Sequence, residues 1–225
     1  MSDRKSQISR KTKETDIELT LSLDGTGSAS VSTTVGFFDH MLELLAKHGL
    51  LDLQIKAKGD THVDAHHTVE DVGICLGEAI KKALGDKKGI TRFGQACIPM
   101  DEALAQVAID ISGRGHCVCR IESLSQPSHL RGALEAEIEA VSQKEKTVDQ
   151  AVENLLKRSD EQELLEEFAR ALAVNAGITL HINVPYGKNA HHVVEAVFKA
   201  LGRALRQAVQ PDPRQTHLPS TKGVL

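Results

Sequence analysis

The chain has 225 residues, of which 40% are hydrophobic and 26% are charged, and its formal net charge is −4. This balance is typical of a folded globular protein and argues against an intrinsically disordered one. The basic residues form no dominant block, and no stretch approaches the ~20 apolar residues that a membrane span requires, so we expect neither nucleic acid nor membrane as a partner.

The N-terminal residues MSDRKSQISRK are polar and basic, without the apolar core of a secretory signal, and are predicted to form a flexible leader. Four cysteines (Cys75, Cys97, Cys117 and Cys119) are scattered along the chain, which indicates reduced thiols in a cytoplasmic protein. Cys117 and Cys119 have a spacing that metal sites also use, but a packing role is favoured for them.

The first half of the chain shows alternating and helical periodicities in turn. Alternation predicts strands at 16–23 and 29–35, joined through the turn residues 24–27 as a hairpin. A short helix at 39–48 ends at Gly49, and a strand follows at 51–57. A longer helix is expected at 66–84, where Gly85 stops it.

The second half follows a similar plan. The periodicities predict a strand at 105–111, a helix at 164–175, a strand at 178–184 and a final helix at 190–208. The segment DAHHTVED (64–71) matches NAHHVVEA (189–196), and a helix and a strand precede each of them. We therefore expect an α+β fold made of duplicated half-domains, at 1–95 and 96–225, that together form one domain.

One segment, at about 120–160, interrupts this repeat. It is charged and rich in Gln, and apolar residues recur in it at alternating four- and three-residue steps, at Leu134, Ile138, Val141, Val148, Val152 and Leu155. This narrow stripe suits a projecting helix or helical hairpin that pairs with another copy. A solvated surface insertion without a role in the chemistry is the favoured interpretation.

The sequence His-His-x-x-Glu begins both long helices of the repeat. Neighbouring residues of a helix diverge by ~100°, so His66 and His67 cannot easily bind one ion together, whereas Glu70 can join either of them. The same holds for His191, His192 and Glu195. Mixed imidazole and carboxylate ligands suit Mn²⁺, Fe²⁺ or Zn²⁺, so the two motifs predict divalent metal binding.

Several longer motifs resemble the signatures of the imidazoleglycerol-phosphate dehydratase family. They are RKTKET (10–15), GFFDHML (36–42), the segment 59–71 around HHTVED, KNAHH (188–192) and PSTKGVL (219–225). The resemblance covers about 10–116 and 161–225, in order. It implies a fold like domain 2 of ribosomal protein S5, with each half a mixed sheet backed by helices.

The resemblance also implies a reaction. It is the dehydration of D-erythro-imidazole glycerol phosphate to imidazole acetol phosphate and water, in histidine biosynthesis. The family binds two Mn²⁺ per active site, with ligands from neighbouring subunits of a trimer, and the trimers combine into a 24-subunit cage.

Residue by residue, the resemblance assigns roles to three groups. The implied metal ligands are His40, His66, His67, Glu70, His191, His192 and Glu195, together with Glu167, which stands where many members have a histidine. The implied catalytic acid/base, in contact with substrate, is Glu14. The implied substrate and phosphate contacts are His48, Arg92, Arg114, Lys199, Ser220, Thr221 and Lys222.

Two other functions remain open on the residues alone. A phosphatase or other hydrolase with a dinuclear site would use the same ligands. A non-catalytic metal-binding protein would need neither Glu14 nor the phosphate-binding group. Release of phosphate would identify the hydrolase, since a dehydratase leaves the ester intact.

Overall fold

The computed structural model describes residues 4–121, 139–141, 143 and 147–223. The first half of the fold consists of β1 (Lys5–Lys11), β2 (Thr15–Ser22), β3 (Ala29–Ser32), α1 (Gly36–Gly49), β4 (Asp52–Gly59) and α2 (His66–Leu84). The second half consists of β5 (Phe93–Met100), β6 (Ala103–Asp110), β7 (His116–Ile121), α5 (Val148–Ala176), β8 (Thr179–Tyr186) and α6 (Ala190–Val209).

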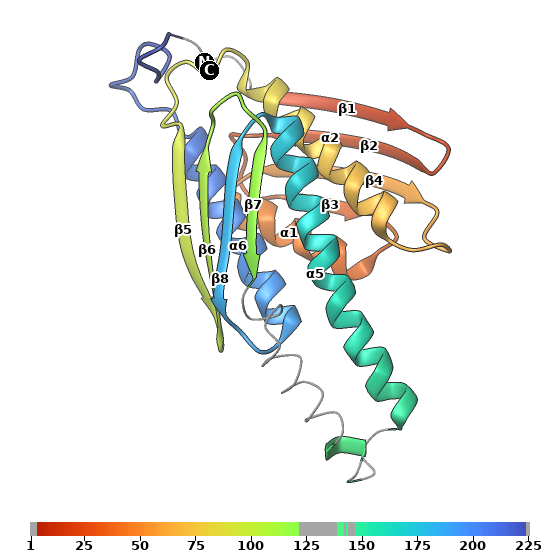
Figure 1. The fold of residues 1–225 in the computed structure, drawn as a ribbon. Helices are drawn as coiled ribbons and strands as arrows, with labels where there is room; N and C mark the ends of the chain where they lie inside the picture. Colours follow the sequence, from red (N-terminus) through yellow and green to blue (C-terminus); the bar gives the residue numbers. More distant parts are fainter. Residues whose placement is uncertain (1–3, 122–138, 142, 144–146, 224–225) are drawn as a thin grey trace.

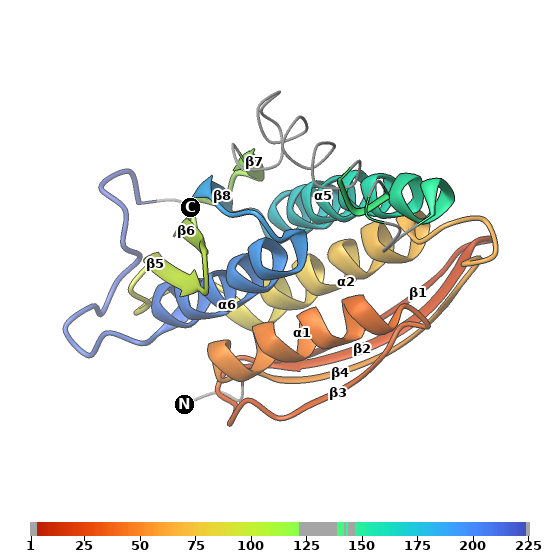
Figure 2. The same cartoon turned by 90° about the horizontal axis from the view of Figure 1, so that it is seen from below.

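Among the described residues, the four helices α1, α2, α5 and α6 form a layer between two four-stranded sheets (Figures 1 and 2). Each sheet turns one face to the helices, and the alternation of β2 and β6 places their apolar side chains on that face, as the buried Ile17, Leu19, Val107 and Ile109 show. The core is therefore shared by both halves, and Phe38, Phe168 and Phe198 meet in it from three different helices. In the described part of the chain, no helix is both long and apolar enough to cross a membrane.

The two halves have the same topology. The strand orders are β1-β2-β4-β3 and β5-β6-β8-β7. In each sheet the first three strands of this order pair antiparallel, and the last strand pairs parallel to its neighbour. The prediction of an α+β fold built from duplicated halves is confirmed.

Two glycines at equivalent positions fix how the helices cross. Gly77 is ten residues after His67, and Gly202 is ten residues after His192. A Cβ atom on Gly77 would lie 2.7 Å from the backbone oxygen of Leu172, and one on Gly202 would lie 2.5 Å from that of Leu45. Because only glycine permits this approach, α2 packs against α5 in the same register as α6 packs against α1.

The structure corrects two predictions for the first half. Residues 5–11, which were expected to be part of a flexible leader, instead form β1, which pairs along its whole length with β2. The segment 29–35 forms no hairpin with 16–23, because β3 pairs parallel to β4 instead. The turn residues 24–27 lead the chain across the sheet, where Asp52 accepts hydrogen bonds from the backbone N–H groups of Thr26 and Ser28.

Other differences concern lengths and missed strands. The helix expected at 39–48 begins at Gly36, and the helix expected at 164–175 extends back to Val148. Most of this extension of α5 lies within the segment predicted as an insertion at 120–160, and it projects beyond the sheets (Figure 1). Residues 134 and 138 of the apolar stripe predicted for 120–160 lie outside the described residues. At the other end of this segment, β7 continues to Ile121. β5 and β7 were not predicted, because the alternation of apolar residues in them is weak.

Candidate active site

The second motif begins α6, and its two histidines diverge as the helical geometry predicts. Nε2 of His191 lies 3.3 Å from a carboxylate oxygen of Glu195, one turn along the same face. The ring of His40, from α1, lies 6.5 Å from the His191 ring, and Phe37 lies 5.2 Å from it. The structure thus brings three predicted ligands, His40, His191 and Glu195, to the junction of α1 and α6.

His192 points away from this group and contacts Glu102, from the turn between β5 and β6. Its Nδ1 lies 2.7 Å from Glu102 Oε2, while Oε1 of the same carboxylate accepts hydrogen bonds from the backbone N–H groups of Lys188 and Asn189. The hydrogen bond with His192, followed by that from Asn189, lowers the pKa of Glu102 to about 2. The same hydrogen bond raises the pKa of His192. Glu102 is therefore an anion whose two oxygens are both engaged.

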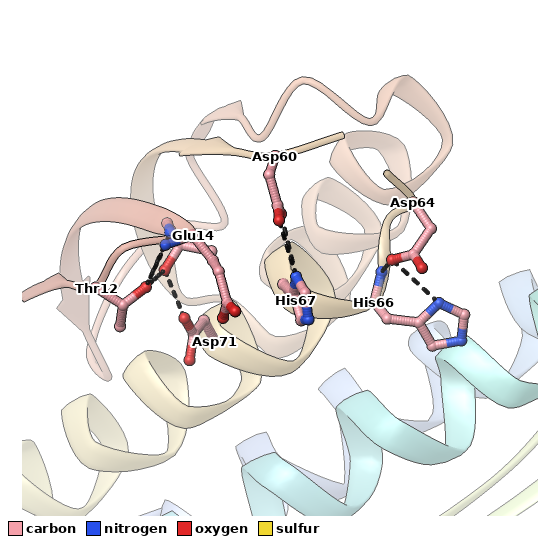
Figure 3. Close-up of polar contacts among 8 residues, drawn as sticks. Thr12, Glu14, Asp60, Asp64, His66, His67 and Asp71 are labelled. Carbon is pink, nitrogen blue, oxygen red and sulfur yellow. Dashed lines mark hydrogen bonds and ion pairs between the residues drawn. The ribbon is translucent and has the colours of Figure 1, made fainter. Parts of the chain in front are cut away.

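The first motif begins α2, and its two histidines are shown in Figure 3. Nδ1 of His67 lies 3.0 Å from Asp60, and Nδ1 of His66 lies 3.4 Å from Asp64, which also accepts the backbone N–H of His66. Asp60 and Asp64 come from the loop between β4 and α2. In the part of the chain that the structure describes, the exposed Glu70 contacts neither histidine.

Glu14 lies at the turn between β1 and β2, beside the start of α2 (Figure 3). The Thr12 hydroxyl accepts hydrogen bonds from the backbone N–H groups of Glu14 and Thr15 and so fixes this turn. The strand end is anchored to α2 because Asp71 accepts hydrogen bonds from Arg10 and from the Thr15 hydroxyl. The pKa of His67 is raised, first by the hydrogen bond to Asp60 and also by the charge of Glu14.

Glu167, on α5, pairs with Arg170 and contacts no other predicted ligand among the described residues. Its place in the fold is nevertheless informative. On α5, the backbone atoms that pack against Gly77 belong to the residues five and nine positions after Glu167, which are Leu172 and Ala176. On α1, the backbone atoms that pack against Gly202 belong to the residues five and nine positions after His40, which are Leu45 and Gly49. Glu167 is therefore the structural counterpart of His40.

Two of the predicted substrate contacts lie close to the second motif. Nζ of Lys199 lies 2.7 Å from Glu195 on α6. His48, at the end of α1, faces the same helix, and its pKa is lowered by burial and then by the positive charges of Lys199 and Arg203. Lys199 on α6 and His48 on α1 thus lie close to each other, beyond Glu195 as counted from His191.

The other substrate contacts lie at the far end of the second sheet. Arg92 pairs with Asp110 at 2.7 and 3.1 Å and donates a hydrogen bond to the backbone oxygen of Pro219, so it holds the tail that carries Ser220, Thr221 and Lys222. Arg114 is exposed in the turn between β6 and β7. Arg92 precedes β5, whereas Glu102 follows it, so roughly 25 Å of extended strand separates them.

One chain does not gather the predicted ligands into a single centre. In residues 4–121, 139–141, 143 and 147–223, no three His, Cys, Asp or Glu side chains converge as a metal site would require. The four cysteines are free, and burial raises the pKa of the Cys117 and Cys119 thiols to about 11 and about 12, which favours packing over metal binding.

Sequence reasoning missed the carboxylates of Asp60 and Glu102. Asp60 falls within the segment 59–71 that carries the resemblance, but no role was assigned to it. Glu102 lies 90 residues from His192 in the sequence, so no local spacing connects them. The duplication offered a signal, because Glu102 directly precedes β6 as Glu14 directly precedes β2.

Comparison with known proteins agrees with the resemblance. The sequence profile of the imidazoleglycerol-phosphate dehydratase family matches residues 33–141 and 135–205. The imidazoleglycerol-phosphate dehydratase of Desulforamulus reducens is 53% identical over 225 residues, which cover 100% of both chains. That of Acetivibrio thermocellus is 52% identical and covers 99% of this chain and 100% of its own.

Solved structures of the same family share the fold. The crystal structure of imidazoleglycerol-phosphate dehydratase from Staphylococcus aureus has a TM-score of 0.69 and 36% identity, covering 92% of this chain and 99% of its own. The enzyme from Pyrococcus furiosus, in complex with (S)-C348, has a TM-score of 0.70 and 34% identity, covering 97% of this chain and 100% of its own. The chain belongs to the imidazoleglycerol-phosphate dehydratase family.

Proposed function

We propose that the protein is a hydro-lyase that dehydrates D-erythro-imidazole glycerol phosphate to imidazole acetol phosphate in histidine biosynthesis, and that it uses two Mn²⁺ per active site. The observation that carries this proposal, beside the family membership, is the pair of His-His-x-x-Glu motifs at equivalent ends of α2 and α6. In both, a carboxylate contacts Nδ1 of the second histidine.

The residues present fit a divalent transition metal. His191 Nε2 and the Glu195 carboxylate lie 3.3 Å apart, close to the ~3 Å between adjacent ligands of a six-coordinate ion with bonds of about 2.1 Å. The proposed ligands are His40, His66, His67, Glu70, Glu167, His191, His192 and Glu195. Their mixed nitrogen and oxygen donors suit Mn²⁺ better than Mg²⁺ or Ca²⁺.

The reaction is difficult because hydroxide leaves poorly and the hydrogen removed is not acidic. Bound metal would act as a Lewis acid toward the imidazole ring of the substrate and would hold that ring in place. The protein must then move the proton. Glu14 is our candidate for this step, because its turn is fixed by Thr12 and its carboxylate accepts no hydrogen bond among the described residues.

We assign phosphate recognition to Arg92, Arg114, Lys199, Ser220, Thr221 and Lys222, with His48 as a further substrate contact. Arginine and lysine supply fixed positive charge, and the hydroxyl groups and backbone N–H groups of the tail supply further donors. Because Arg92 holds the tail through Pro219, its guanidinium and the tail donors would act as one unit.

This assignment makes self-association part of the site. The tail and Arg92 lie at the opposite end of β5 from Glu102 and His192, too far apart to contact one small substrate. A second copy of the chain would have to bring its tail end to the metal end of the first. We therefore propose a homo-oligomer, and the resemblance to the family implies that it is assembled from trimers into a 24-subunit particle.

The test is turnover of imidazoleglycerol phosphate by protein purified without air and reconstituted with Mn²⁺. We expect imidazole acetol phosphate to form with no release of inorganic phosphate. Release of phosphate would instead support the hydrolase. Bound Mn²⁺ without either reaction would support a metal-binding protein.

A further inference from the structure

The duplication gives Glu14 a counterpart in the second half of the fold. Glu14 directly precedes β2 and lies beside His67, the second histidine of its motif. Glu102 directly precedes β6 and contacts His192, the second histidine of the other motif. In each half of the fold, the glutamate before the second strand thus lies beside the second histidine of the motif.

The two glutamates differ in what engages them. In the first half, Nδ1 of His67 is paired with Asp60, which leaves Glu14 without a hydrogen bond to its carboxylate among the described residues (Figure 3). In the second half, Glu102 itself pairs with Nδ1 of His192, and its other oxygen holds the backbone N–H groups of Lys188 and Asn189. Glu102 therefore connects the histidine to the loop that precedes α6.

The position of Asp60 is also fixed by packing. It follows Gly59, and a Cβ atom on Gly59 would lie 2.0 Å from the hydroxyl oxygen of Thr68, the residue next to His67. That hydroxyl is buried and makes no hydrogen bond among the described residues, so it is not paired with Asp60 or with His67. Asp60 and Glu102 consequently reach equivalent histidines from different loops.

We propose that Glu102 is a positioning residue that keeps the proton of His192 on Nδ1 and so presents Nε2 as a metal ligand, and that Asp60 does the same for His67. A carboxylate has no proton to donate, so a neutral imidazole beside it must donate its own. The other ring nitrogen then carries the lone pair that binds metal. This inference rests on the proposed function, because it concerns the same metal site.

The variant Glu102→Gln tests this proposal. The amide oxygen must accept from the two backbone N–H groups, since turning the amide round would place its N–H₂ against those donors. Its N–H₂ then faces Nδ1 of His192, which must accept and leave its proton on Nε2. The shape of the site is retained while its ligand atom is blocked. Glu18→Gln, an exposed glutamate on β2, is the matched control.

Two measurements follow. Mn²⁺ titration by electron paramagnetic resonance should show a dissociation constant about 10 to 100 times higher for Glu102→Gln than for wild type and Glu18→Gln. Solid-state ¹⁵N spectra of histidine-labelled metal-free protein should place the His192 proton on Nδ1 in wild type and on Nε2 in Glu102→Gln. His192→Asn identifies the signals.

A His192 proton on Nε2 in the wild-type protein would overturn the proposal, and this holds even if the variant does not fold. Unchanged Mn²⁺ affinity in folded Glu102→Gln would overturn it as well. Neither measurement uses substrate, so a wild-type protein that binds Mn²⁺ in this way and yet fails to dehydrate imidazoleglycerol phosphate would contradict only the proposed reaction.

Discussion

Glu167 of α5 occupies the position in the second half of the fold that His40 of α1 occupies in the first. The crossing of α5 with α2 repeats that of α1 with α6, with Gly77 and Gly202 at the two closest approaches. His40 lies 6.5 Å, ring to ring, from His191. We therefore expect Glu167 to reach the metal bound by the first motif once the neighbouring copy completes the site.

Replacement of this residue tests the expectation. Glu167→Ala should raise the dissociation constant for Mn²⁺ about 10-fold or more, because one ligand is lost, while Glu167→His should stay within about threefold of wild type, because imidazole is an equivalent ligand. Isothermal titration calorimetry measures both. If Glu167→Ala binds as tightly as wild type, Glu167 is no ligand and only its ion pair with Arg170 remains as a role.

Glu14→Gln should separate chemistry from binding. The amide preserves size but cannot accept a proton, so we expect kcat to fall by about 10² to 10⁴ while Mn²⁺ content stays the same. Rapid-quench turnover and elemental analysis give the two values. Full activity in this variant would reject the assignment of Glu14, and loss of Mn²⁺ would show instead that it acts through the metal ligands.

The glycine contacts between the helices should be sensitive to a single methyl group. Gly77→Ala and Gly202→Ala should each lower the free energy of unfolding by about 1 to 3 kcal/mol, because the new Cβ meets backbone atoms that cannot move aside. Gly36→Ala is the control, since a Cβ there meets nothing within 4 Å. Urea unfolding monitored by circular dichroism measures all three. Equal stability of Gly77→Ala and Gly36→Ala would contradict the close crossing.

Mixed oligomers test whether the site is shared. His192→Asn and Arg92→Ala should each be inactive alone, since one removes a proposed ligand and the other the proposed phosphate contact. If each site combines His192 of one copy with Arg92 of another, random co-assembly in equal amounts should restore about one quarter of the sites. Assays after joint refolding or co-expression measure this. Activity no higher than that of the separate variants would place both residues in one chain's own site.

Local patterns predicted much of this fold. The bounds of α2 and α6 follow from apolar periodicity with Gly85 or Pro211 beyond the end, and the matching of 64–71 with 189–196 predicted the duplication. β1 was missed because its polar residues suggested a leader, although its hydrogen bonds come from β2. The pairing of β3 with β4 was also missed. A short turn after β2 favours a hairpin, whereas the parallel pairing of β3 with β4 depends on contacts that form only in the assembled sheet.

In the candidate site too, the residues that depend on local spacing were predicted and those that depend on tertiary structure were not. Sequence identified the metal-binding motifs because their chemistry depends on the spacing within one helix. It did not identify Glu102 as the partner of His192, because β5, β6 and the loop before α6 must first fold together. Nor could it place Arg92 relative to the motifs, since this depends on the direction of β5 and on contacts between copies of the chain.

The structure of the Mn²⁺-loaded oligomer, with the metals located by their anomalous scattering, would test the shared site most directly. We expect two Mn²⁺ per site, bound by histidines and glutamates of the first motif of one copy and of the second motif of its neighbour. Motifs that stay apart in the assembled particle, with no metal between them, would contradict it.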